Sequence, residues 1–205
     1  MWILPSRNRP HNVARLFAQW PLVGSSTPGR LAVDADDPKL DEYCAVALPD
    51  NWQIAVFPRL SMGAKTNAVW EMNRLEPWYG YIDDDALPRT WEWDKRLVEA
   101  AGANGIAHCW NGIGNEKLAS QPVLGGDLVR ELGWILYPGI ARVYGDDILT
   151  AIGRKRGCIT YLPDVQLEAM HWSNGKAPRD EGYFYPEHDA DKAIYDKWIA
   201  AGMPC

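Results

Sequence analysis

Short apolar runs alternate with segments of helical periodicity along most of the chain, and this alternation restricts the possible fold more than any other feature. The run Trp2–Leu4, for example, ends at Pro5 and precedes Asn12–Trp20, where apolar residues recur at helical spacing. Strands that alternate with helices favour a mostly parallel sheet with helices on both faces. We therefore predict a single-domain α/β fold, for which 205 residues supply a sizeable core.

The same pattern places the remaining elements. Further strands are predicted at Leu31–Val33, Gln53–Phe57, Tyr79–Ile82, Ile106–Trp110, Ile159–Leu162 and Gln166–Met170. Further helices are predicted at Leu40–Leu48, Lys65–Asn73, Trp91–Ala101, Asp127–Leu132, Asp146–Arg156 and in a last segment that ends at Ala201. A Gly/Asn/Pro-rich connection, Asn111–Gly126, and a polar aromatic tail segment, Asn174–Asp189, show neither periodicity.

Three consecutive aspartates, Asp83, Asp84 and Asp85, follow directly on one predicted strand. Neighbouring carboxylates repel one another, so such a cluster costs stability unless a cation offsets the repulsion. Oxygen ligands suit Mg²⁺ or Mn²⁺, and such ions typically bind through one or two carboxylates together with substrate phosphates. The alternative is a solvated acidic turn that caps the helix beginning near Trp91.

Two other polar groups also follow predicted strands. Ser6, Arg7 and Arg9 come after the first strand, and Asp34 and Asp36 come after the second. In α/β sheets, ligands bind at the carboxyl ends of the strands. The coincidence of these groups favours a metal and phosphate site over an acidic turn.

The order of these motifs resembles the glycosyltransferase-A fold, in particular the family-two-like nucleotide-sugar glycosyltransferases. Trp2–Pro10 is similar to that family's first strand and nucleotide-binding loop, and Val33–Asp36 to the second strand end, where a carboxylate holds uracil or ribose. Gly63–Asn67 resembles the segment whose basic residue, here Lys65 in place of the more usual arginine, faces the diphosphate.

The later motifs carry the resemblance through residues 1–175, which we expect to form the catalytic domain. Ile82–Asp85 resembles the D-x-D metal motif, although three consecutive aspartates leave its register open. Tyr144–Asp147 is similar to the acidic pair at a helix start that supplies the catalytic base, and Glu168–His171 to the late histidine that often completes the metal site.

The resemblance implies metal-dependent transfer of a sugar, typically from a UDP-sugar, to an acceptor hydroxyl. It assigns Asp85 directly to Mn²⁺ or Mg²⁺, with Asp83 on the ribose or a metal-bound water and His171 as a nitrogen ligand. Asp146 or Asp147 would act as general base, and one base without a nucleophile partner suggests single displacement with inversion. The nucleotide would be held by Ser6, Arg7, Arg9, Asp34, Lys65, Asp83 and Asp84.

Each assignment has an alternative. Asp146 is also a favourable N-cap for its helix, and His171 beside Trp172 fits a core or surface histidine whose hydrogen bonds are satisfied. A nucleotidyltransferase would share the carboxylates and the metal, but it normally has a Gly-rich first loop, which Ser6–Pro10 lacks. A carbohydrate- or nucleic-acid-binding module built on tryptophans would need no carboxylate triplet.

Composition bears on the acceptor and on location. The net charge of −6 argues against non-specific polyanion binding, whereas eleven tryptophans suggest exposed rings that stack on sugars or bases. No stretch approaches the roughly 20 apolar residues of a membrane span, so we expect no membrane partner. The cysteines Cys44, Cys109, Cys158 and Cys205 lack C-x-x-C spacing and indicate reduced thiols in a cytoplasmic protein.

Compact single-domain transferases of this kind resemble those of bacteriophages, some of which glycosylate hydroxymethylated pyrimidines in DNA. The tryptophans and the cluster Arg154–Arg156 suit a flipped base and its backbone, in which case the location is the host cytoplasm. A soluble sugar, a glycan or a protein hydroxyl fits the sequence almost as well. The segment 176–205, with its aromatic and charged residues, is predicted to close over the donor site as a lid.

Overall fold

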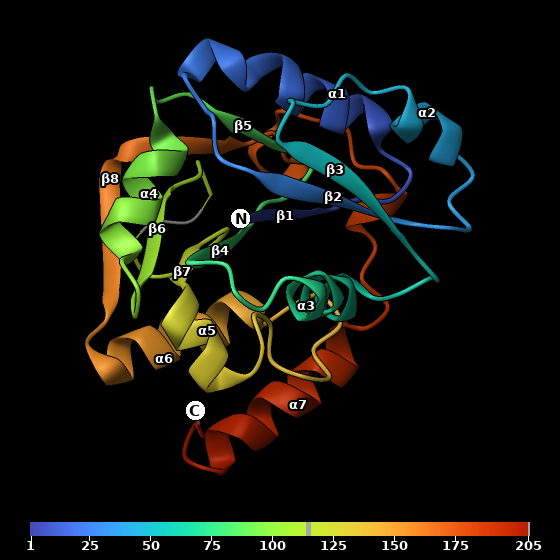
Figure 1. Cartoon of the computed structure of the whole chain (residues 1–205). Helices are drawn as coiled ribbons and strands as arrows, with labels where there is room; N and C mark the ends of the chain where they lie inside the picture. The colour runs from blue at the N-terminus through green and yellow to red at the C-terminus, as the bar shows by residue number, and fades with distance from the viewer. Residues whose placement is uncertain (114–115, 205) are drawn as a thin grey trace.

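The computed structural model of the chain, which describes residues 1–113 and 116–204, contains a curled mixed sheet of eight strands (Figure 1). The strand order is β3-β2-β1-β4-β7-β6-β8-β5. The strands are β1 (Trp2–Pro5), β2 (Gly29–Asp34), β3 (Trp52–Phe57), β4 (Trp78–Tyr81), β5 (Ala86–Pro88), β6 (Ile106–Trp110), β7 (Val123–Gly125) and β8 (Ile159–Ala169). This is the single-domain α/β fold that the sequence predicts.

Parallel pairing holds through the first half of the sheet, where β3, β2, β1 and β4 run in the same direction. In this half Leu4 pairs with Leu31, and Leu31 pairs with Ile54. The second half is mixed, because β7 is antiparallel to both β4 and β6, β8 is parallel to β6, and β5 is antiparallel to β8. The carboxyl ends of β1, β2 and β4 therefore lie at one edge of the sheet.

Helices cover both faces of the sheet. Figure 1 shows α1 and α2 on one side and α3, α5, α6 and α7 on the other. The helices are α1 (Pro10–Gln19), α2 (Leu40–Cys44), α3 (Met62–Met72), α4 (Trp93–Ala101), α5 (Gly126–Leu132), α6 (Gly145–Arg156) and α7 (His188–Ala200). Short 3-10 turns occur at η1 (Pro21–Val23), η2 (Trp172–Asn174) and η3 (Glu181–Tyr183).

Most of the tryptophans form the core rather than a surface. On the α1 face, the rings of Trp2, Trp20, Trp52 and Trp93 contact one another, with centroids of Trp2 and Trp93 only 4.9 Å apart. Gly80 makes room for Trp2, because a Cβ at this position would lie 2.4 Å from the indole ring. Among the eleven tryptophans only Trp91 and Trp172 are exposed, so the expected set of stacking rings is much smaller than the composition suggests.

Several predicted elements need correction. The two strands expected between residues 159 and 170 form one long strand, β8, and the helix expected from Leu40 to Leu48 ends at Cys44. The three-residue strands β5 and β7 were not predicted, because β5 lies between the aspartates and a polar turn, and β7 lies inside the Gly/Asn/Pro-rich connection. Both are antiparallel, which is why the sheet is less parallel than expected.

Two expectations about the whole chain can also be compared with the described residues. No helix among them has the length and apolar character needed to span a bilayer. Cys109 is a buried free thiol, whereas Cys44 is a free thiol that is exposed. Cys205 lies outside the described residues.

Candidate functional site

A cavity of about 1360 Å³ opens at the carboxyl ends of β1, β2 and β4. The strand ends supply one part of its wall. Other parts come from α3 and the loop before it, the β6–β7 connection, the loop before α6 and the segment between β8 and α7. Its lining includes almost every residue that the sequence singles out: Ser6, Arg7, Arg9, Asp34, Lys65, Asp83, Asp84, Asp85, Asp146 and His171. Asp147 is not among the described lining residues.

The three aspartates after β4 divide into two roles. Asp84 is held from three sides, because Ser6 Oγ donates to its Oδ2 at 2.6 Å and Arg9 Nη1 and Asn12 Nδ2 reach its Oδ1 at 3.3 and 3.5 Å. The Tyr43 hydroxyl extends this network, at 2.7 Å from Ser6 Oγ, and accepts a hydrogen bond from the Arg9 backbone N–H. Asp84 therefore organises the first loop.

Asp83 and Asp85 form the other pair. Burial, together with the charges of Asp85 and Asp84, raises the pKa of Asp83 to about 7. Burial also raises the pKa of Asp85. The structure thus favours Asp83-x-Asp85 as the register of the predicted D-x-D motif, because Asp84 is held by the first loop. It also excludes the alternative of a solvated cap, because Asp84 and Asp85 are buried and β5 separates the triplet from α4.

The tail segment reaches this acidic pair. The Tyr183 hydroxyl donates to Asp85 Oδ2 at 2.9 Å, and the Tyr183 side chain is only 5% exposed. Its ring also contacts His171 edge-on, at 4.4 Å between centroids. Among the described residues, no three metal-ligating side chains converge, so His171 does not complete a cluster with Asp83 and Asp85.

A second tail residue reaches the first loop. Asp180 accepts hydrogen bonds from Arg9 Nε at 3.1 Å and from Arg9 Nη2, and the Arg9 guanidinium lies 4.2 Å from the centre of the Tyr183 ring. The Arg9 side chain is almost fully buried. The Asp180 carboxylate thus binds Arg9, the cation that the sequence assigns to a phosphate. The Tyr183 hydroxyl binds Asp85, the carboxylate that the sequence assigns to a metal.

His171 has a structural task as well. Its Nδ1 lies 2.7 Å from Ser173 Oγ and accepts the Ser173 backbone N–H at 3.1 Å, so the ring caps the turn η2. Burial, and then the charges of Arg9 and Arg142, lower the pKa of His171. The lowered pKa keeps the imidazole neutral, which is the form that binds metals.

The second basic group lies at the end of β2. Lys65, from the first half of α3, is 3% exposed and its Nζ lies 2.7 Å from Asp34 Oδ1. Arg7 Nη1 lies 3.2 Å from Asp34 Oδ2 and 2.7 Å from Asp36 Oδ1. Burial lowers the pKa of Lys65 although Asp34 opposes this effect. Asp34 therefore joins the first loop to α3 and brings two cations to one side of the cavity.

Asp146 lies in the first turn of α6, on another part of the cavity wall. The helix begins at Gly145, its N-cap residue is Tyr144, and no side chain caps it, so the N-cap alternative for Asp146 is wrong. The Tyr81 hydroxyl donates a hydrogen bond to Asp146 Oδ1. Burial, with the charge of Asp147, raises the pKa of Asp146 to about 7, a value suited to a general base near neutral pH.

Two contributors to the cavity were not predicted from the sequence. Arg142 lies 4.4 Å from the Tyr185 ring centre, and its loop is fixed by Asp191 of α7, whose carboxylate accepts three backbone N–H groups at 2.8–2.9 Å. Gln121 donates from Nε2 to Asp83 Oδ2 at 3.1 Å. No periodic or motif signal marks these residues, since each reaches the site through a loop.

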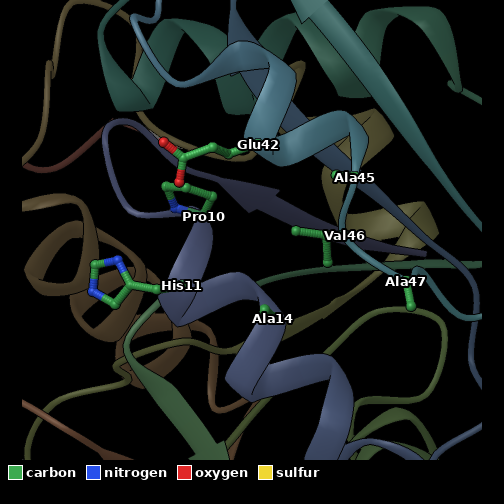
Figure 2. A pocket seen from close by; sticks show the side chains of 7 residues that line it. All are labelled: Pro10, His11, Ala14, Glu42, Ala45, Val46 and Ala47. Carbon is green, nitrogen blue, oxygen red and sulfur yellow. The ribbon is translucent and has the colours of Figure 1, made fainter.

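A smaller hollow between α1 and α2 is a weaker candidate (Figure 2). Its wall is mainly Pro10, Ala14 and the apolar residues 45–47. Among the described residues that line it, His11 and Glu42 have ionisable side chains. In Figure 2, Glu42 turns toward Pro10 while the His11 ring points away from the others. Because its polar groups do not converge, we place the candidate site in the larger cavity.

No protein-family model and no curated protein sequence matches this chain. Solved structures do share its fold. A mannosyltransferase from Pyrobaculum calidifontis, in complex with GDP-Man and Mn²⁺, superposes with a TM-score of 0.66 at 13% identity, over 82% of this chain and 55% of that one. This chain thus spans about half the length of that enzyme.

Two further solved structures share the fold of this chain. A mycobacterial protein matches over 100% of this chain and 75% of its own length, with a TM-score of 0.63 and 11% identity. The galactosyltransferase LgtC, in complex with donor and acceptor sugar analogues, matches with a TM-score of 0.50 at 13% identity, over 78% of this chain and 72% of that one. The chain therefore has the glycosyltransferase-A fold that its motifs indicate.

Proposed function

We propose that this chain is a metal-dependent glycosyltransferase that moves a sugar from a nucleoside diphosphate to an acceptor hydroxyl with inversion. One observation carries the proposal: Asp83 and Asp85 line the same cavity as Arg9, Lys65 and Asp146. Acidic ligands, phosphate-binding cations and a carboxylate with a pKa near neutrality are the parts that such a transfer needs. The mannosyltransferase and galactosyltransferase that share the fold support the reaction class.

The donor set suits Mn²⁺ or Mg²⁺. Asp85 would bind the ion directly, and Asp83 would bind either the ion or the ribose. Burial raises the pKa of both carboxyl groups, and a bound cation would favour their ionised form. His171 would add a neutral nitrogen once Tyr183 no longer lies against it. A bound divalent ion supplies a Lewis acid that neutralises the leaving diphosphate.

The nucleotide would contact the first loop and the end of β2. Arg9 is suited to bind a phosphate, because its guanidinium already makes a bidentate contact with the Asp180 carboxylate. Lys65 and Arg7 supply further positive charge, while Ser6 and Asp84 hold Arg9 and the loop in place. Two bases of the donor nucleotide need to be compared. Uracil is implied by the sequence resemblance, and guanine is present in the GDP-Man complex of the mannosyltransferase.

Asp146 would act as the general base. It would take the proton of the acceptor hydroxyl as that oxygen attacks the sugar, and Tyr81 would hold the carboxylate in orientation. Direct attack by the acceptor in one displacement inverts the anomeric centre. Asp147, which is not among the described lining residues of the cavity, is the weaker candidate for this role.

The segment 176–205 would act as a lid. Asp180 and Tyr183 hold it over Arg9 and Asp85, so the donor and the ion would have to displace these two contacts before the segment closes again over them. Exclusion of water by such a segment protects a reactive donor from hydrolysis.

The acceptor is the broadest part of the proposal. Hydroxymethylated pyrimidines in phage DNA are one candidate, and a sugar, a glycan or a protein hydroxyl are the others. The cluster Arg154–Arg156 adds little support for DNA, because Arg154 and Lys155 bind backbone carbonyls and Arg156 pairs with Glu131. Trp172, beside the tail, is the exposed ring nearest in sequence to the site residue His171.

A thermal-shift experiment tests the proposal. UDP and GDP should each be added with and without Mn²⁺, and one of them should raise the melting temperature only when the metal is present. Ligand at 100 times its Kd stabilises a protein by about 2.7 kcal/mol, which is a shift of several degrees. Equal melting temperatures in all mixtures would reject the nucleotide site.

A further inference from the structure

Gln121 is an unusual residue in the wall of the large cavity. Its side chain is only 2% exposed, and its backbone has a φ of +52° just before β7. Residues other than glycine rarely adopt this left-handed conformation, and they keep it where the surrounding structure requires it. The conformation places a long amide side chain next to the acidic pair.

One end of this amide has a clear partner. Gln121 Nε2 donates to Asp83 Oδ2 at 3.1 Å. The reversed amide would set an oxygen against a carboxylate oxygen, so the donor orientation is the chemically favourable one. Gln121 thus fixes the orientation of Asp83 from the segment before β7, whereas Asp84 is held by the first loop.

The other end has none. Gln121 Oε1 is buried and accepts no hydrogen bond from any residue in the part of the chain that the structure describes. Buried amide oxygens are nearly always paired, so an unpaired one in a cavity wall calls for an external donor. The cavity supplies neighbouring acceptors in Asp83 and Asp85, and acceptors next to acceptors select ligands rich in hydroxyl groups.

We propose that Gln121 is a positioning and specificity residue of the donor site, in which Nε2 orients Asp83 and Oε1 accepts a hydrogen bond from a hydroxyl group of the nucleotide sugar. This inference rests on the proposed function. The hydroxyl belongs either to the ribose or to the transferred sugar, and the two sources can be separated by ligands that lack one of them.

The experiment measures binding by calorimetry in the presence of Mn²⁺. Parent protein, Gln121→Met and the control Gln53→Met, which changes an exposed glutamine on β3, are titrated with UDP or GDP, whichever binds more tightly. The same nucleotide is then compared in its 2′-deoxy and 3′-deoxy forms, as its glucose conjugate and as its 2-deoxyglucose conjugate. The melting temperature of each free variant reports its folding.

The parent should bind a hydroxylated ligand about 3- to 10-fold more tightly than one of its deoxy analogues, as expected for one neutral hydrogen bond. Gln121→Met should lose that preference, and Gln53→Met should keep it. Loss confined to the deoxyribose ligands identifies the ribose hydroxyl, and loss confined to the deoxyglucose ligand identifies the transferred sugar.

Two results would overturn the inference while leaving the proposed function intact. One is a parent that binds nucleotide but shows no preference between hydroxylated and deoxy ligands, a result that needs no variant to fold. The other is a folded Gln121→Met variant with the preference of the parent. A parent that binds neither UDP nor GDP would reject both the inference and the proposed function.

Discussion

Tyr183 and Asp85 are 98 residues apart in sequence, yet the Tyr183 hydroxyl donates a hydrogen bond of 2.9 Å to the Asp85 carboxylate. The contact joins the segment before α7 to the acidic pair after β4. A metal ion at Asp85 and this hydroxyl would compete for the same oxygen. In this structure the segment before α7 is therefore bound to the site through Tyr183 and Asp180.

Tyr183→Phe should increase the affinity for Mn²⁺ by about 3- to 10-fold, because removing one hydrogen bond frees Asp85 Oδ2 for the ion. Tyr161→Phe, a change on β8 outside the cavity lining, is the matched control. Manganese titration followed by calorimetry measures both. Weaker binding by Tyr183→Phe than by Tyr161→Phe would mean that the phenol helps to hold the ion.

Asp85→Ala should abolish metal-dependent nucleotide binding while the fold remains stable, because the change removes a direct oxygen ligand and relieves repulsion within the triplet. Asp84→Ala should instead lower the free energy of unfolding by about 1–3 kcal/mol, since the Ser6 hydroxyl and the Arg9 guanidinium lose a buried acceptor. Urea unfolding and nucleotide titration separate the two effects. Identical behaviour of the two variants would contradict the Asp83-x-Asp85 register.

Asp146→Asn should keep nucleotide-sugar binding and lose transfer by about 10²- to 10⁴-fold, because an amide cannot accept the acceptor proton. The change removes no helix cap, since α6 has no side-chain cap. Asp147→Asn is the control. An active Asp146→Asn together with an inactive Asp147→Asn would assign the base to the other member of the pair.

The pKa of Asp146 also predicts a pH dependence of stability. Burial raises this pKa to about 7 in the folded chain, whereas an aspartate in an unfolded chain has a pKa of about 3.9. Between these values the folded state holds a proton that the unfolded state has released, so stability at this group falls as the pH rises from about 4 to about 7.

Asp146→Asn lacks this titration. Its free energy of unfolding relative to the parent should therefore rise between pH 5 and pH 7, by at most about 1.4 kcal/mol per pH unit. Urea unfolding at several pH values measures the difference. A difference that is independent of pH would show that Asp146 has an ordinary carboxyl pKa.

The first half of the fold could be predicted from the sequence because its signals are local. Buried strands such as Leu31–Val33 end in polar residues, and the parallel strands bring those ends to one edge, which is why Ser6, Asp34 and Asp83 meet in the cavity. Short antiparallel strands such as β7 have no such signal, because three residues are too few to show a period and pairing with longer strands defines them.

The contacts made by loop residues, in the tail and elsewhere, could not be predicted for a different reason. Asp180 reaches Arg9 across 171 residues of sequence, and Gln121 reaches Asp83 across 38. Loops carry all these residues, and no periodicity specifies where a loop side chain points. The tryptophans illustrate the opposite error, because composition suggested exposed rings whereas most of them pack in the core.

The most direct test of the central claim is the metal dependence of turnover. The chain is incubated with radiolabelled UDP-glucose or GDP-mannose, with Mn²⁺ or with a chelator, and both sugar release and transfer to hydroxymethylcytosine DNA, hydroxymethyluracil DNA and unmodified DNA are measured. We predict sugar release or transfer that requires the metal and disappears in Asp85→Ala. Turnover that is equal with the chelator, or unchanged in Asp85→Ala, would contradict a metal-dependent transferase built on the Asp83–Asp85 pair.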